Sequence, residues 1–324
     1  MRTLTVVLMA CVVLMLGLAA QPAQAVLLYA TDFESPTYTT GYSNLNGQNY
    51  WVVDAALGHV QAYAGGSVPW VPQSTGVITY YSPPVANPYG GDQYVGLSTT
   101  TGGGSGNIRA KYQLSALVSG LLTLSVDFLN GPEHDFPPYQ GGLFARNWAA
   151  NVAQVGLYTC SASSYVDHSA PPARTGNWAY RVLAFDSAGL QLTNTGTTAG
   201  YRYDGVAGFD ELPRETWWRL GVTFDTTTRR ITQYLSKNLM TSEEWVMDNP
   251  QALHDYGAGP VLVDLYMRGG AGGTTDVDAV SFYNVGNGQL HLYDNPRIEL
   301  IPEPATMALM GLGGIAMLIR RKKR

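Results

Sequence analysis

The sequence WWRLGVTFD, from Trp217 to Asp225, is followed by a polar turn and then by RITQYL, from Arg230 to Leu235. Both segments are rich in aromatic and β-branched residues, which favour extended strands. Two such segments joined by a short polar turn predict a β-hairpin. Large aromatic rings contribute most of the apolar surface that a β-sandwich buries, so we expect Trp217 or Trp218 to be buried.

Similar short segments recur along the chain between clusters of Gly, Pro, Asn and Thr. In Leu121–Leu129, apolar residues at even-numbered positions alternate with Thr123, Ser125 and Asp127, which predicts a strand with one polar face. A single helical turn is expected at Ser242–Val246, because Ser242 can cap it. The other strands are expected at Leu27–Phe33, Gly76–Tyr81, Gln93–Ser98, Ile108–Leu114, Val152–Tyr158, Tyr180–Phe185, Val261–Met267, Val277–Tyr283 and Leu290–Tyr293.

The many predicted strands and the lack of a long predicted helix indicate an all-β, antiparallel jelly-roll sandwich. The hairpin Trp217–Leu235 resembles that of laminin-G-like and concanavalin-A-like sandwiches, in which a Trp opens a strand that ends in Asp. Thr31–Glu34 and Leu292–Asn295 resemble the ends of galactose-binding-like modules, whose terminal strands pair and share a structural cation. Pro296 interrupts the late segment, so we predict the concanavalin-A-like sandwich and keep the galactose-binding-like fold as the alternative.

The last 24 residues have the layout of a sorting signal. Pro302-Glu303-Pro304 precedes 15 uncharged residues, Ala305–Ile319, and then five cations: Arg320, Arg321, Lys322, Lys323 and Arg324. This order resembles the PEP-CTERM sorting signal of Gram-negative bacteria, which an exosortase membrane enzyme recognises and removes. The resemblance implies an exosortase partner, a transmembrane helix before processing and a cytoplasmic basic tail. The alternative is an ordinary C-terminal anchor that is never cut.

The first 25 residues have the composition of a signal peptide. Arg2 precedes an apolar stretch, Leu4–Leu18, and Ala23 and Ala25 form an A-x-A site for signal peptidase. The predicted organisation is therefore a signal peptide at 1–25, a β-sandwich at 26–300 and a sorting signal at 301–324. It predicts export, first as an intermediate anchored in the inner membrane and then to the cell envelope, the outer surface or the extracellular matrix.

The charge of the body differs from that of the whole chain. Six of the 19 Lys and Arg residues lie in the two signals, but only one of the 24 Asp and Glu residues does. The body therefore has 13 cations and 23 carboxylates, a net charge of −10. This charge argues against nucleic-acid binding. Cys160 is the only cysteine outside the signals, so no disulfide forms within the body.

No pattern in the sequence indicates catalysis. Jelly-roll glycosidases typically carry two or three carboxylates that alternate along one strand, and retaining enzymes hold the acid and the nucleophile about 5–5.5 Å apart. Asp276 and Asp278 have the alternating spacing but no third carboxylate beside them. Glu243 and Glu244 are adjacent in the sequence, so their side chains diverge. We expect a non-catalytic envelope or extracellular-matrix protein. The alternatives are a carbohydrate-binding module for extracellular polysaccharide and a diverged polysaccharide-active enzyme.

Two kinds of ligand site remain open for the body. Asp276, Asp278 and Asp294, together with Asp32 and Glu34 if the terminal strands pair, would supply oxygen ligands for a structural calcium ion. No other cofactor is required. Aromatic residues predicted in loops would contact a sugar: Trp178, Trp148, Tyr139 and Tyr89.

Overall fold

The computed structural model describes residues 25–38, 45–54, 59–64, 68–70, 79–81, 86–91, 93–98, 107–130, 140–147, 154–161, 178–190, 192, 199–201, 209, 212–213, 215–268, 276–285 and 290–302. Their regular structure consists of β-strands and one short 3-10 helix, η1 (Gln48–Tyr50). None of these residues belongs to a helix long and apolar enough to cross a membrane. The predicted signal peptide before Ala25 and the predicted sorting helix lie outside the described residues.

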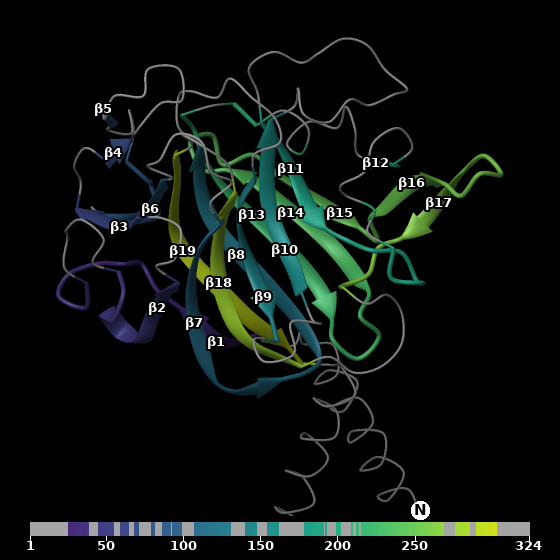
Figure 1. Ribbon diagram of the computed structural model, residues 1–324, viewed down its shortest axis with the longest axis horizontal. Helices are drawn as coiled ribbons and strands as arrows, with labels where there is room; N and C mark the ends of the chain where they lie inside the picture. Colours follow the sequence, from purple (N-terminus) through teal and green to yellow (C-terminus); the bar gives the residue numbers. More distant parts are fainter. Residues whose placement is uncertain are drawn as a thin grey trace, which may run out of the picture.

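Two antiparallel sheets make up most of the fold (Figure 1). The larger sheet contains β1 (Val26–Ala30), β3 (His59–Ala64), β6 (Gln93–Ser98), β8 (Leu121–Asn130), β13 (Trp217–Asp225), β14 (Ile231–Asn238), β15 (Glu244–Asp248) and β19 (Leu290–Ile301). Its strand order is β15-β14-β13-β8-β19-β6-β3, and β1 also pairs with β19.

The second sheet contains β2 (Trp51–Asp54), β7 (Asn107–Val118), β9 (Gln140–Arg146), β10 (Gln154–Ser161), β11 (Trp178–Leu183) and β18 (Val277–Val285). Its order is β11-β10-β9-β18-β7-β2. A three-stranded sheet contains β12 (Ala199–Tyr201), β16 (Gln251–Asp255) and β17 (Pro260–Asp264). A two-stranded sheet contains β4 (Val68–Trp70) and β5 (Thr79–Tyr81).

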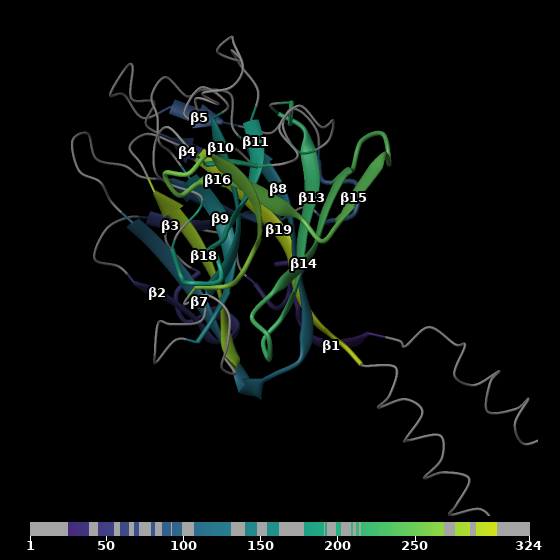
Figure 2. The ribbon, with the colours of Figure 1, turned by 90° about the vertical axis from the view of Figure 1, so that its right-hand side faces the viewer.

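The core lies between the two larger sheets, which pack as two layers (Figure 2). Leu122, Leu124, Val126 and Phe128 on alternate positions of β8 are buried, as the alternation predicted. Across the interface, the rings of Phe282 on β18 and Tyr293 on β19 lie 4.8 Å apart. The all-β antiparallel sandwich predicted from the sequence is thus confirmed.

The predicted hairpin is present as β13 and β14, which pair from Trp218 to Phe224. Asp225 stabilises the turn by accepting hydrogen bonds from the Thr227 N–H and the Thr228 hydroxyl. Both tryptophans are buried, on opposite faces of the sheet. Trp218 belongs to the main core, whereas Trp217 packs in a second cluster on the outer face with Tyr94, Leu129, Leu239 and Leu292.

The helical turn expected at Ser242–Val246 is wrong. Ser242 has a φ of 64°, which is not helical, and the residues that follow form the edge strand β15. Lys237 of β14 pairs with Glu244, and the Glu243 carbonyl accepts a hydrogen bond from the Asn238 N–H. Pairing with β14 therefore outweighs the local capping pattern.

The late segment does not stop at Tyr293, because β19 continues past Pro296 to Ile301. Its register against β8 shifts between Asp294 and Arg297, and Asn295 has a φ of 47°, so the strand accommodates the proline in a bulge. The first and last described strands, β1 and β19, pair with each other. The features that led to both predicted jelly-roll families are therefore present, and the choice between the families stays a prediction.

Candidate functional site

The site with the most polar contacts lies where β19 changes partners. β8 pairs with the whole of one edge of β19, from His291 to Ile301. On the other edge, β6 pairs with Leu290–Tyr293 and β1 pairs with Arg297–Leu300. Asp294, Asn295 and Pro296 lie between these two pairings, at a point where Pro296 needs no N–H for a sheet hydrogen bond.

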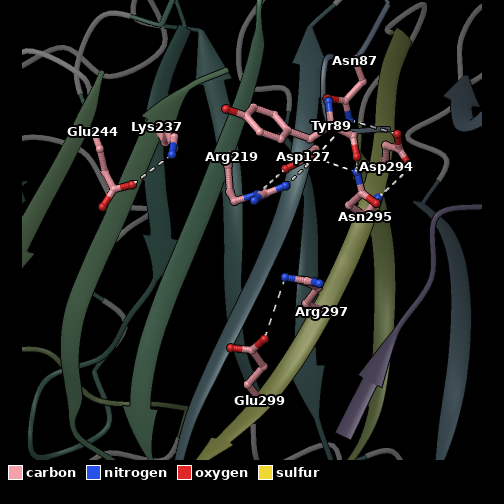
Figure 3. Close-up of polar contacts among 10 residues, drawn as sticks. All are labelled: Asn87, Tyr89, Asp127, Arg219, Lys237, Glu244, Asp294, Asn295, Arg297 and Glu299. Atoms are coloured by element: carbon pink, nitrogen blue, oxygen red, sulfur yellow. Dashed lines mark hydrogen bonds and ion pairs between the residues drawn. The ribbon is translucent and has the colours of Figure 1, made fainter. Parts of the chain in front are cut away.

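Two buried carboxylates, Asp127 and Asp294, face each other across β8 and β19 at this point (Figure 3). Asn87 Nδ2 donates to both of them, at 3.0 Å to Asp127 and 2.9 Å to Asp294. Asn295 Nδ2 donates to Asp127 over 2.8 Å. Arg219 donates Nε and Nη2 to the two oxygens of Asp127 over 2.7 and 2.9 Å. Asp127 therefore accepts four hydrogen bonds, and a bidentate guanidinium compensates its charge.

The loop over Asp294 requires glycine. A side chain at Gly90 would collide with the Asp294 carboxylate, and one at Gly91 would collide with the carboxylate of Glu34. Glu34 in turn accepts a hydrogen bond of 2.8 Å from the Gln93 N–H at the start of β6. The loop that contains Gly90 and Gly91, together with Glu34, therefore lies beside the part of β19 that neither β6 nor β1 pairs with.

Burial raises the pKa of Asp294 to about 8, and the charges of Asp127 and Glu34 act in the same direction. Hydrogen bonds from the Asn295 N–H and the Asn87 amide favour the ionised form, but they offset only part of this shift. The Asp294 carboxyl is therefore mostly protonated at neutral pH. Asp127 and Asp294 are too buried to contact a substrate, so we assign them a structural role.

The raised pKa predicts a dependence of stability on pH. The unfolded chain ionises Asp294 near pH 3.8, whereas the folded chain does so only near pH 8. The stabilisation is therefore full below about pH 4 and is lost as the pH rises toward 8. We expect the Asp294 contribution to the free energy of unfolding to fall by a few kcal/mol over this window.

Urea denaturation of the body at several pH values measures this fall. Asp294→Asn, which keeps the shape but does not titrate, should have a flatter profile than the unmodified chain. Equal slopes for the two proteins would show that Asp294 does not titrate with a raised pKa.

A row of charged residues extends from this pair across the outer face of the larger sheet. Strand register places Asp127, Arg219, Lys237 and Glu244 side by side on β8, β13, β14 and β15 (Figure 3). Tyr89 lies over the two cations, with its ring centre 5.5 Å from Arg219 Cζ and 5.9 Å from Lys237 Nζ. The Tyr89 residue is 50% exposed. This end of the site presents an accessible aromatic ring beside two cations, each of which is also paired with a carboxylate.

The residues proposed as calcium ligands are not all in one place. Asp276 precedes β18 and Asp278 lies on it, in the smaller of the two main sheets, whereas Asp294 lies on β19 in the larger sheet. The part of the chain that the structure describes contains no group of three or more His, Cys, Asp or Glu residues suited to a metal ion. Structural calcium stays a prediction.

The residues proposed to contact a sugar are mostly outside the structural description. Trp178 begins β11, but its side chain is not described, and Trp148 and Tyr139 lie outside the described residues. Of these aromatic residues, only Tyr89 can be placed at the site. The alternation in Leu121–Leu129 placed Asp127 on a polar strand face but did not predict its burial, because its partner Asn87 comes from a loop 40 residues away.

Comparison with known proteins supports the C-terminal assignment. Residues 300–323 match the PEP-CTERM protein-sorting motif, so the chain carries this motif at its C-terminus. The motif indicates export, a membrane-anchored intermediate and processing by an exosortase. No curated protein sequence matches the chain.

Several solved structures match most of the chain at low identity and low TM-score. One is a protein of unknown function with a galectin-like fold from Bacillus subtilis, with 10% identity, a TM-score of 0.39 and coverage of 86% of this chain and 100% of that chain. Cellulose induced protein Cip1 has 12% identity, a TM-score of 0.39 and coverage of 83% and 96%. Basic winged bean lectin has 8% identity, a TM-score of 0.37 and coverage of 81% and 97%.

Proposed function

We propose that this chain is a non-catalytic protein that an exosortase releases from the inner membrane for delivery to the cell envelope or extracellular matrix of a Gram-negative bacterium. The match of residues 300–323 to the sorting motif carries the proposal. The predicted signal peptide supports it, because that segment would export the body while Arg320–Arg324 keep the tail in the cytoplasm.

Mass spectrometry of the protein from its native host tests this function. We expect the surface-exposed protein to end close to Pro302 and to lack the five terminal cations. A Glu303→Ala variant serves as the control, because it changes the motif but leaves the apolar segment and the basic tail intact. It should remain full-length in the membrane. An intact terminus on the surface pool, in a strain with a working exosortase, would mean that the tail is only an anchor.

A second function, binding of an extracellular polysaccharide, is favoured by the position of Tyr89. Its exposed ring lies over Arg219 and Lys237 on the outer face of the larger sheet. An exposed aromatic face can pack against the apolar face of a sugar ring. Lys237, whose partner Glu244 is 47% exposed, is the cation that would pair with a carboxylate-bearing sugar such as a uronate.

Glycan-array binding of the purified body tests this second function. We expect binding to uronate-containing polymers, at least tenfold weaker in Tyr89→Ala. Tyr256→Ala is the matched control. Tyr256 is similarly exposed, at 52%, but it follows β16 of the three-stranded sheet and does not belong to the candidate site. Equal loss in both variants, or no binding to any glycan, would rule out Tyr89 as a sugar contact.

A further inference from the structure

The sorting motif follows the folded body without a linker. Ile301, the last residue of β19, pairs with Leu121 of β8, and the next residue is Pro302 of the motif. Leu300 pairs with Leu122 in the same ladder. The first proline of the motif is therefore covalently attached to a residue that is held in the sheet.

The residues before the motif are also held on their other side. In β1, Val26 pairs with Leu300, Leu27 with Glu299, Tyr29 with Ile298 and Ala30 with Arg297. The segment Arg297–Leu300 therefore lies between two strands, with partners on both of its edges.

Two buried side chains fix this arrangement. Ile298 is fully buried in the core, and Tyr29 of β1 is buried with its ring stacked on Tyr112 at 4.0 Å. The pairing of β1 with β19 is thus part of the packed body and not a loose contact at its edge.

The main chain of Arg297–Leu300 has no free edge to offer a processing enzyme while it stays in the sheet. Enzymes and receptors that bind an extended peptide pair with its main chain, and here both edges of that main chain are already paired. Processing of a folded substrate then proceeds through local opening, at a rate set by the population of the open form.

Of the two strands that pair with Arg297–Leu300, β1 is the shorter and has fewer partner strands. It has five residues and pairs only with β19, whereas β8 is paired on both sides and carries much of the core. Val26 and Leu27 at its start are about half exposed. Opening at β1 frees one edge of Arg297–Leu300 and leaves β8 in place.

We infer that β1 is a clamp on the sorting site, and that an exosortase processes this chain only after β1 has separated from β19. This inference rests on the proposed function. It adds that the enzyme's substrate includes the end of β19 in an opened form, and that the clamp sets the rate of release.

A reversible cross-link between β1 and β19 tests the clamp. Directly opposed residues of an antiparallel pair have Cα atoms about 4.5–5.5 Å apart, within the range that a disulfide spans. Leu27→Cys with Glu299→Cys joins such a pair. The full chain, in a background with Cys11→Ser and Cys160→Ser, is mixed with membrane vesicles that contain the host exosortase. We expect the cross-linked chain to be processed at least tenfold more slowly than the same chain after reduction.

Two further variants separate the clamp from other effects. Gln233→Cys with Asp248→Cys places a cross-link between β14 and β15 of the same sheet, and it should be processed equally before and after reduction. Insertion of eight Gly and Ser residues between Ile301 and Pro302 should make processing of the β1–β19 cross-linked chain as fast as that of its reduced form. Equal processing of the oxidised and reduced β1–β19 variant would overturn the clamp. If even the unmodified chain is not processed, the proposed function itself fails.

Discussion

Replacing Trp51 with Ala is expected to lower the free energy of unfolding of the body by about 4–5 kcal/mol. Trp51 is fully buried, and its ring stacks on Phe282 with centres 5.0 Å apart. Its Nε1 donates a hydrogen bond of 3.1 Å to the Tyr38 hydroxyl. Truncation removes the largest ring at this place in the core, leaves a cavity between the sheets and takes a donor away from Tyr38.

A pair of milder variants separates the hydrogen bond from the packing. Trp51→Phe and Trp218→Phe remove the same volume from two buried tryptophans, but Trp218 Nε1 has no hydrogen-bond partner among the described residues. We expect Trp51→Phe to cost about 1 kcal/mol more than Trp218→Phe, because only Trp51 loses a bond. Urea denaturation with tryptophan fluorescence measures both. Equal costs would mean that the bond to Tyr38 contributes nothing.

Removal of the Asp127 carboxylate should have the second largest effect, with a loss of about 3 kcal/mol in Asp127→Ala. Asp127 is the common acceptor for Arg219, Asn87 and Asn295, so its loss removes four hydrogen bonds. Asn87 keeps its bond to Asp294 and Asn295 keeps its bond to the Tyr89 carbonyl, but the Arg219 guanidinium loses its carboxylate. Arg219 retains 24% side-chain exposure and can recover some solvation, which places the expected cost at the lower end for a buried ion pair.

Glu244→Ala is the matched control for this prediction. It breaks an ion pair in the same charged row, between Lys237 and Glu244 at 3.5 Å, but the Glu244 side chain is 47% exposed. Exposed pairs contribute little, so we expect a loss below about 1 kcal/mol. Chemical denaturation at one pH compares the two variants. Similar losses would show that the network around Asp127 is no stronger than a surface pair.

The strands of the fold could be predicted where a local pattern specifies them. Alternation in Leu121–Leu129 and the aromatic hairpin Trp217–Leu235 depend on neighbouring residues, and both were confirmed. Ser242–Val246 was predicted wrongly because a capping pattern is local, whereas the strand observed there depends on pairing with β14.

The polar site could not be predicted, because its residues come together from distant parts of the sequence. Asn87 contacts Asp127 and Asp294, which are 40 and 207 residues away from it. Pro296 was interpreted as the end of a strand. The structure shows instead that a proline can mark the place where one strand passes from one partner to another.

The position of β19 also determines when the body can fold. This strand lies between β8 on one edge and β6 and β1 on the other, yet it is made from residues 290–301, the last part of the body to be synthesised. The larger sheet therefore lacks an interior strand until nearly the whole chain has been made. Pairings between the two ends of a chain form slowly, because a long loop must close first. Completion of the larger sheet is therefore expected to be a late step in folding, because the strand that joins its two halves is the last part of the body to be made.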